Sequence, residues 1–331
     1  MPNAYVAGTG FFVPPKIVTN EELSQYMNTT DEWIRERTGI LERRYVEKGV
    51  GPSDLAIPAT EQALDAAGLS VKDIDCMIFT TSTPDYYIPG SGCLLQEKMG
   101  FNEIGALDIR VQCSGFIYGI SIAEQYIKAG AFNNILLVGA EVQSTAMDLS
   151  DKGRETAVIF GDGAGAVIIR STEKDRGILS THMHTDGKYL KELWVEAPAS
   201  NEGHPRILPE HLDQGKQYLK MNGREVFRHA ITRFTEVIHE CLAANKLKIE
   251  DIDILIPHQA NLRTTQMLQK KMNLTDDQVF SNIHKYGNTT AASIPIALAE
   301  AVNEGRVTEG DRVIFASFGS GFTWAAAAVK W

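Results

Sequence analysis

The sequence predicts an α/β protein built from two similar halves. Strand-like and helix-like stretches alternate along all 331 residues, which is typical of sheets covered by helices. The stretch LDAAGLSVKDIDCMIF (64–79) is matched by LAANKLKIEDIDILIP (242–257), 178 residues later. CSGFIYGISIAEQYIKAG (113–130) is matched in the same order by NTTAASIPIALAEAVNEG (288–305), 175 residues later. Two matches at nearly the same spacing indicate an internal duplication, with a repeat too long for a solenoid unit.

The matched segments predict the same succession of elements in both halves. The first pair begins as the end of a helix and passes through a turn into a buried strand. The second pair begins with small residues, continues as an apolar helix and ends at a glycine suited to a helix C-cap. A strand follows each helix, NILLVGA (134–140) and RVIFASFG (312–319). We therefore expect an N-terminal half over residues 1–175 and a C-terminal half over residues 176–331.

Composition and charge narrow the class of protein. The chain is 44% hydrophobic and 22% charged, which is ordinary for a globular protein. Its net charge of −10 disfavours a nucleic-acid partner. No apolar run approaches the roughly 20 residues of a membrane helix, and the N-terminus has no basic region of the kind that begins a signal peptide. The four cysteines are widely separated, which predicts reduced thiols in a cytoplasmic protein and no zinc site.

Cys113 is the candidate nucleophile. It follows the strand-like stretch DIRV and precedes an apolar helix, so it stands at a strand-to-helix turn. A lone cysteine is usually a small buried apolar residue. Here a helix N-terminus is expected to lower the thiol pKa and favour the thiolate, and Ser114 and Gly115 leave room for a substrate carbonyl. We therefore expect a reactive Cys113, and we interpret the other three cysteines as buried structural residues.

Two further residues are candidates for the same site. His258, in IPHQANLR, directly follows the buried strand DIDILI, and ligand sites lie at such strand ends in open α/β sheets. Asn288, in YGNTTAASIP, is the residue that the duplication places opposite Cys113. Taken alone, Asn288 would be interpreted as a helix N-cap. A pseudo-twofold fold would bring the two helix starts together at its centre.

These residue types favour acyl chemistry. A cysteine can form a thioester, and His and Asn side chains can stabilise an oxyanion. The glycines of FASFGSGFTWAAAAV (315–329) can expose a backbone N–H to a bound oxygen. Two reactions fit this set of groups: hydrolysis, as in papain-like proteases, and acyl transfer to carbon.

Several motifs together resemble the β-ketoacyl-[acyl-carrier-protein] synthase III family. They are TTDEWIRERTGI, CSGF, FGDGAGA, PHQANLR, YGNTTAASIP and FGSGFTW, and they occur in the family's order along the whole chain. The resemblance implies the thiolase-like fold, a five-layered αβαβα arrangement of two duplicated halves. It also implies a homodimer that needs no metal or redox cofactor and uses coenzyme A thioesters as substrates. Hydrolysis is then disfavoured.

The resemblance assigns roles to the candidate residues. Cys113 would accept an acyl group from an acyl-CoA. His258 and Asn288 would bind the thioester carbonyl of malonyl-acyl carrier protein and stabilise the enolate formed as CO₂ leaves. The backbone N–H groups of Cys113 and Ser320 would form the oxyanion hole. All three side chains are present, which argues against a non-catalytic partner subunit, and no cysteine follows Cys241, which argues against thiolysis.

Other residues would bind the substrates. The resemblance places four at the coenzyme A site: Trp33, Arg37, Lys152 and Arg263. Arg224 and Arg228, four residues apart on a predicted helix, would dock the acidic carrier protein. Ile88 stands where a bulky Phe often borders the primer pocket, and the segment 188–217 is interpreted as a remodelled lid.

Departures from the common family pattern leave an alternative open. Ser114 follows the nucleophile where the fatty-acid-starting enzymes have Ala, and Leu41 replaces an arginine. Such changes resemble relatives that make alkylquinolones or resorcinols. The alternative is therefore a specialised-metabolite enzyme that condenses a longer or unusual acyl group, with malonyl-CoA as a possible extender.

Overall fold

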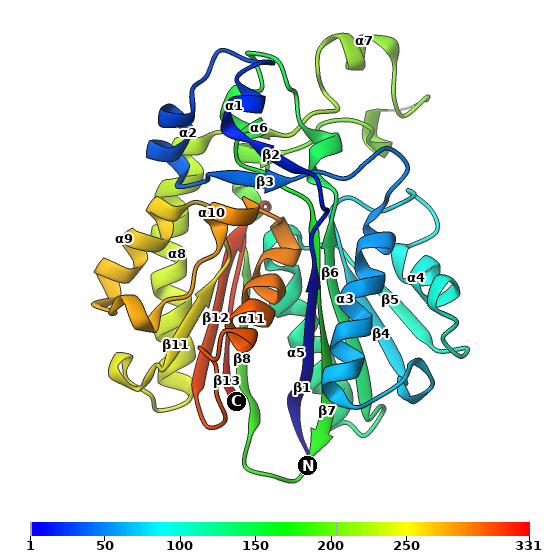
Figure 1. Cartoon of the computed structure of the whole chain (residues 1–331), viewed down its shortest axis with the longest axis vertical. Helices are drawn as coiled ribbons and strands as arrows, with labels where there is room; N and C mark the ends of the chain where they lie inside the picture. The colour runs from blue at the N-terminus through cyan, green and yellow to red at the C-terminus, as the bar shows by residue number, and fades with distance from the viewer. Residues whose placement is uncertain (1, 203) are drawn as a thin grey trace.

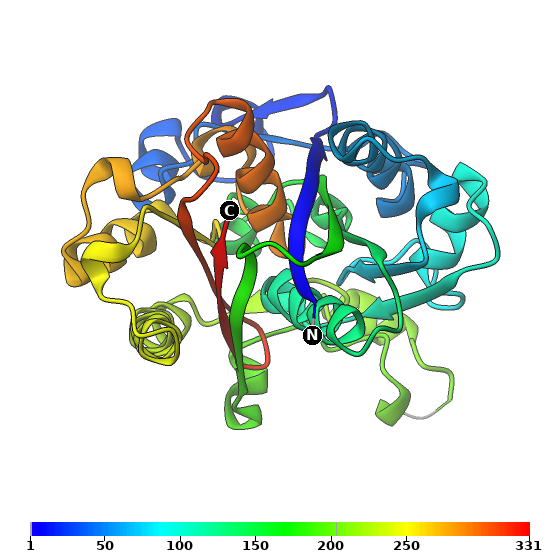
Figure 2. The same cartoon turned by 90° about the horizontal axis from the view of Figure 1, so that it is seen from below.

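The computed structural model describes residues 2–202 and 204–331, which form two β-sheets and three layers of helices (Figures 1 and 2). The layers alternate as helix, sheet, helix, sheet and helix. The five-layered αβαβα arrangement expected from the family resemblance is therefore confirmed. No helix in the described ranges is long and apolar enough to cross a membrane.

Each half of the chain forms one sheet. The first sheet has the strand order β1 (Asn3–Phe12), β7 (Gly163–Thr172), β6 (Asn134–Glu141), β4 (Cys76–Thr80) and β5 (Gly105–Ile109). The second has the order β11 (Ile254–Pro257), β12 (Arg312–Gly319), β13 (Thr323–Lys330) and β8 (Gly177–Thr185). The expected division between residues 175 and 176 lies in the connection from β7 to β8. A single parallel bridge from Leu255 to Val279 stands at the edge of the second sheet that corresponds to β5.

Two helices form the middle layer, between the sheets. They are α5 (Gly115–Lys128) and α11 (Ser293–Asn303), and each contacts strands of both sheets. Every residue of α11 from Ser293 to Ala301 is buried, as expected of a helix that is apolar on all sides. The outer layers are amphipathic helices: α3 (Pro52–Ala67) and α4 (Ser91–Met99) on one side, α8 (Gly223–Ala244) and α9 (Leu262–Met272) on the other.

Short elements gather at one end of the molecule, over the ends of the strands (Figure 1). They are β2 (Ile17–Thr19), α1 (Asn20–Leu23), α2 (Asp31–Thr38), β3 (Glu42–Arg44), α6 (Arg154–Ala157), β9 (Leu193–Trp194), α7 (Pro209–Asp213), β10 (Lys220–Met221) and α10 (Ile283–Tyr286). Arg43 anchors this cap because its guanidinium is fully buried and donates to Asn20 Oδ1 and to the carbonyl of Val158. The segment 188–217, whose residue 203 lies outside the described residues, belongs to the cap.

The structure corrects the alignment of the two halves around Cys113. Gln112 and Thr290 both have left-handed φ values, 44° and 49°, and each begins a one-turn 3₁₀ helix that leads into α5 or α11. Cys113 is therefore equivalent to Ala291, 178 residues later, and the expected equivalence with Asn288 is wrong. The reason is helix length: α11 has 11 residues and α5 has 14, so their C-cap glycines are closer in register than their starts.

The halves meet closely because two glycines face the start of α11. Gly139 on β6 pairs with Gly165 on β7. A Cβ at Gly139 would lie 2.7 Å from the carbonyl oxygen of Ala291, and one at Gly165 would lie 2.7 Å from the backbone nitrogen of Ile296. Because these neighbours are backbone atoms, they cannot give way by a rotamer change.

We predict that Gly165→Ala lowers the free energy of unfolding by about 1–3 kcal/mol, because the added methyl group overpacks the contact between β7 and α11. Urea denaturation of both variants measures the effect. Gly187→Ala is the matched control, since a Cβ there meets no atom within 4 Å. Equal midpoints for the two variants would contradict the proposed packing constraint.

Candidate active site

Cys113 lies in the one-turn helix η2 (Gln112–Ser114), between β5 and α5. The left-handed φ of Gln112 is uncommon for a residue with a side chain and makes the sharp turn that aims the cysteine toward the second sheet. The turn packs against β4: a Cβ at Gly115 would lie 1.9 Å from Thr80 Oγ1. The strand-to-helix turn expected from the sequence is therefore present, and only a glycine fits directly behind it.

Cys113 is buried, with 6% of its surface exposed, and its sulfur lies against the end of β12. A Cβ at Gly319 would be 2.7 Å from Cys113 Sγ, so this position must lack a side chain. The backbone N–H groups of Ser320 and Cys113 both act on the sulfur and favour its charged form. They are the two groups that the sequence predicted as an oxyanion hole.

The structure does not support a resting thiolate. Burial raises the pKa of the Cys113 thiol to about 12, and the nearby Glu141 carboxylate adds to the rise, while the two N–H groups oppose it. Desolvation penalises the charged form of a buried thiol more strongly than a helix N-terminus favours it. The expectation of a lowered pKa is therefore wrong, because the sequence shows the helix start but not the burial.

Glu141, at the end of β6, is a buried carboxylate that the sequence analysis missed. Its oxygens accept hydrogen bonds from the hydroxyls of Ser82 at 2.8 Å and Thr83 at 2.7 Å, and from the N–H of Ala291 at 3.4 Å. Burial raises its pKa to about 7 despite these bonds. The available signal was an acidic residue ending the apolar strand NILLVGAE. Since Glu141 ties the β4 loop to the start of η8 (Thr290–Ala292), it holds the two halves together next to Cys113.

His258 follows β11, and its imidazole is buried between the halves. Its Nδ1 lies 2.6 Å from Ser293 Oγ, at the first residue of α11. Burial lowers the pKa of His258 to about 3, so the ring is neutral at physiological pH. A Ser293 hydroxyl that donates to Nδ1 leaves the proton on Nε2, as an oxyanion donor requires. Ser293 was also missed, although a serine opening the apolar helix SIPIAL was the available signal.

Asn288 lies beside a buried bridge to Phe160, and its backbone is held at both ends. Its N–H donates to the carbonyl of Ile159 at 2.9 Å, and its carbonyl accepts from Gly161 at 3.1 Å. Its side-chain Oδ1 accepts the N–H of Thr290 at 2.9 Å. Because Oδ1 is occupied, the Asn288 NH₂ group is the part available to a bound oxygen.

Cys113 stands where two cavities meet. The smaller, of about 160 Å³, is lined by Cys113, His258 and Asn288, and extends past Phe227 and Asn261 on α8 and α9. The larger, of about 610 Å³, extends from Cys113 toward the β4 loop and the segment 194–201. The three predicted catalytic side chains therefore converge on one cavity, and the predicted lid covers the other.

The predicted coenzyme A residues lie outside the smaller cavity. The guanidinium carbon of Arg37 is 4.5 Å from the Trp33 ring centroid, and that of Arg154, which the sequence analysis missed, is 4.7 Å from it. Asn261 links this group to Arg263, since its Nδ2 donates to the carbonyl of Arg37 and its Oδ1 accepts the N–H of Arg263. An indole with arginines at the ring suits a purine base and phosphates.

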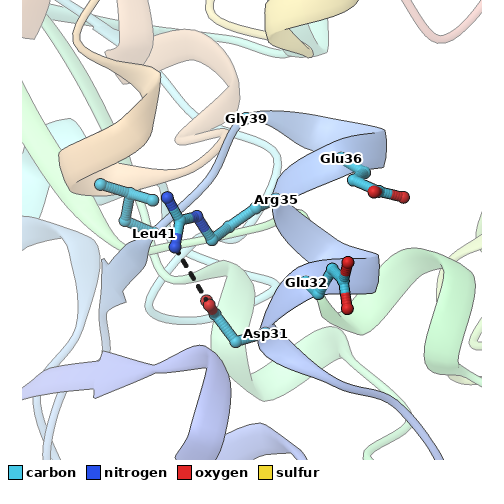
Figure 3. A pocket seen from close by; sticks show the side chains of 6 residues that line it. All are labelled: Asp31, Glu32, Arg35, Glu36, Gly39 and Leu41. Carbon is cyan, nitrogen blue, oxygen red and sulfur yellow. Dashed lines mark hydrogen bonds and ion pairs between the residues drawn. The ribbon is translucent and has the colours of Figure 1, made fainter.

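Lys152 lies farther along the same end of the molecule. It is exposed and lines a groove of about 820 Å³ with Arg154, Leu212 and Tyr218. A second surface depression, beside α2, is lined by Arg35 and three carboxylates and lies apart from the catalytic residues; Figure 3 shows Arg35 between Asp31 and Leu41. Leu41, which replaces an arginine of the family pattern, is 43% exposed there.

The remaining predicted residues lie on the surface. Arg224 and Arg228 are exposed on the first turns of α8, but Arg228 forms an ion pair of 2.5 Å with Glu225, which weakens the positive patch. Ile88 is 78% exposed and lines neither cavity of the single chain, so its predicted place in the primer pocket is not met there. Tyr87, the preceding residue, lines the larger cavity instead.

The chain matches two family models and many curated proteins. A model described as 3-Oxoacyl-[acyl-carrier-protein (ACP)] synthase III matches residues 107–187, and its C-terminal counterpart matches residues 242–331. The Beta-ketoacyl-[acyl-carrier-protein] synthase III of Clostridium perfringens ATCC 13124 is 42% identical over 330 residues, and the match covers 100% of each chain. The protein of the same name from Xanthomonas campestris ATCC 33913 is 42% identical, with 98% of each chain covered.

Solved structures agree with the sequence relatives. The 3-oxoacyl-[acyl-carrier-protein] synthase III of Aquifex aeolicus VF5 is 39% identical and superimposes with a TM-score of 0.91, covering 99% of this chain and 100% of that one. The corresponding Thermus thermophilus enzyme is 38% identical, also with a TM-score of 0.91, and covers 99% of both chains. With its thiolase-like layers and its Cys, His and Asn around one cavity, the chain belongs to the β-ketoacyl-[acyl-carrier-protein] synthase III family.

Proposed function

We propose that the protein starts fatty-acid chains by condensing an acyl-CoA primer with malonyl-acyl carrier protein. One observation carries the proposal: Cys113, His258 and Asn288 line one cavity, and the N–H groups of Cys113 and Ser320 act on the sulfur. The relatives' names favour this reaction over the specialised-metabolite alternative. Whether the extender arrives on carrier protein or on coenzyme A is decided by groups outside the catalytic trio.

In the first step the Cys113 sulfur attacks the thioester carbonyl of the acyl-CoA. The carbonyl oxygen becomes an oxyanion that the N–H groups of Cys113 and Ser320 stabilise. The carbon–sulfur bond to coenzyme A then breaks, and the thiol proton of Cys113 leaves with the coenzyme A thiol. Because the Cys113 pKa is about 12, proton loss accompanies the attack and does not precede it.

In the second step the malonyl thioester enters the same cavity. Its carbonyl oxygen accepts hydrogen bonds from His258 Nε2–H and from the Asn288 NH₂ group. The bond to the carboxylate breaks, CO₂ leaves, and the electron pair forms an enolate that these donors stabilise. The enolate carbon attacks the acyl group on Cys113, the carbon–sulfur bond breaks, and the thiolate takes up a proton. A neutral imidazole suits this role because it donates a hydrogen bond without protonating the carbanion.

The remaining features of the function are proposals as well. We expect no metal or redox cofactor, since coenzyme A enters only as part of a substrate. We propose a homodimer, supported by the edge of β5, which pairs with β4 alone, and by the exposed Tyr86 and Ile88 beside it. Docking of the carrier protein at Arg224 and Arg228 and the cytoplasmic location stay predictions from the sequence.

We predict that Cys113 alone carries the acyl group. Incubation with a panel of acyl-CoAs from acetyl to dodecanoyl, followed by intact-protein mass measurement, should show one added acyl group in the wild type and none in Cys113→Ala. Cys93→Ala is the matched control, because Cys93 is an exposed free thiol and should leave the mass gain unchanged. A mass gain that persists in Cys113→Ala, or that never occurs in the wild type, would refute the proposed function.

The two reaction steps should separate in variants of the other catalytic residues. His258→Ala and Asn288→Ala should still be acylated at Cys113, but should lose about 10²–10³-fold in condensation rate, because each removes one donor to the enolate oxygen. Radiolabelled CO₂ release and acyl-enzyme mass measure the two steps. His239→Ala, an exposed histidine on α8, is the control. Equal losses in acylation and condensation would contradict the division of roles.

The pKa of Cys113 gives a pH prediction. Its alkylation by iodoacetamide should rise about tenfold per pH unit between pH 6 and 9 without a plateau, because the thiolate fraction keeps growing up to the pKa near 12. Cys93, on the surface, is an internal control in the same peptide map. A plateau for Cys113 below pH 8 would show that a thiolate already exists in the resting enzyme.

A further inference from the structure

The two cavities at Cys113 must hold different parts of the substrates, and this assignment rests on the proposed function. His258 and Asn288 line only the smaller cavity, so the thioester end of the extender occupies it. The acyl group on Cys113 must leave that space free for the enolate. The larger cavity, which shares Cys113, Phe160 and Leu193 with the smaller one, is the remaining room for the acyl chain.

The lining of the larger cavity is unusually polar for a hydrocarbon chain. Glutamines enter it from three separate segments: Gln112 from η2, Gln143 from η3 (Gln143–Ala146) and Gln217 from the lid. Ser82 and Ser320 add hydroxyls. No carboxylate is among the described residues that line it, and Arg110, exposed on the surface, is its one charged residue. Apolar contacts come from Phe160, Leu193, Trp194, Val195 and Leu219.

Two of the polar groups have no hydrogen-bond partner. Within the described residues, Gln217 Oε1 and Thr290 Oγ1 are shielded from water and unpaired, although both residues line the cavity. An unpaired buried acceptor costs about 1–3 kcal/mol unless a ligand supplies the missing bond. Gln143, by contrast, is held: its Nε2 donates to Ser82 Oγ at 2.9 Å and to Glu141 Oε2 at 3.1 Å. The cavity therefore has one fixed polar wall and an acceptor facing it without a donor.

We infer that the acyl group loaded on Cys113 carries a hydroxyl beyond its carbonyl carbon, and that Gln217 recognises it in the larger cavity. A hydroxyl can donate to Gln217 Oε1 and accept from a glutamine amide at the same time. A ketone or carboxylate accepts but does not donate, so it would leave Gln217 Oε1 unpaired. A plain alkyl chain would leave all the polar groups unpaired and would be rejected for that reason.

The test compares acyl-CoAs of the same size, with acylation of Cys113 followed by intact-protein mass. The pairs are 4-hydroxybutyryl-CoA with pentanoyl-CoA and 6-hydroxyhexanoyl-CoA with heptanoyl-CoA, and succinyl-CoA is the carboxylate arm. We expect at least about tenfold faster acylation by the hydroxyacyl member of one pair. Gln217→Leu should abolish this preference by favouring the alkyl member, whereas Gln125→Leu, an exposed glutamine on α5, should keep it.

The outcomes separate the inference from the function on which it rests. Acylation by both members of each pair at equal rates, or faster by the alkyl member, overturns the hydroxyl assignment and leaves the condensing function intact. Faster acylation by succinyl-CoA than by either hydroxyacyl-CoA also overturns it, and points to Arg110. An unchanged preference in Gln217→Leu, with native thermal stability, overturns the role of Gln217. No acylation by any thioester overturns the proposed function itself.

Discussion

The site depends on the close approach of two helix starts at the centre of the molecule. The first turn of α5 and the turn before α11 meet through residues with little or no side chain: a Cβ at Gly115 would be 3.5 Å from that of Ala291, and one at Gly139 would lie 2.7 Å from the Ala291 carbonyl oxygen. Gly319 closes the other side of Cys113. Larger residues at these positions would push the two halves apart, and the cysteine of one half would no longer face the histidine of the other.

The same close packing sets the protonation of the catalytic groups. Water is excluded where the halves meet, so the neutral forms of all three buried titratable groups are favoured. Burial raises the pKa values of Cys113 and Glu141 and lowers that of His258. For His258 the sign is clear: the unfolded chain binds a proton below its ordinary pKa of 6.5 and the folded one does not, so folding stability falls as pH drops from about 6.5 toward 3. A site built from neutral donors is the consequence.

The two halves use equivalent positions for different purposes. Thr80 and His258 end equivalent strands, and Gly115 and Ser293 begin equivalent helices. In the first half the glycine makes room for Thr80; in the second the serine hydroxyl meets the His258 ring at 2.6 Å. A small residue therefore serves the nucleophile, while a hydrogen-bonding residue serves the donor. The duplication supplied two similar helix starts, and a few side chains divided the chemistry between them.

The sequence by itself determined the layered α/β fold, the duplication, and Cys113, His258 and Asn288, because periodicity, glycines and motif order are local properties that survive in one dimension. It placed Asn288 opposite Cys113 wrongly, since the difference in length between α5 and α11 is hidden by their matching C-cap glycines. Only the tertiary structure decided the pKa of Cys113, because burial is the sum of neighbours from both halves. It also decided the partners of Glu141 and His258 and the polar wall of the larger cavity, whose glutamines lie up to 105 residues apart in the chain and meet only after folding.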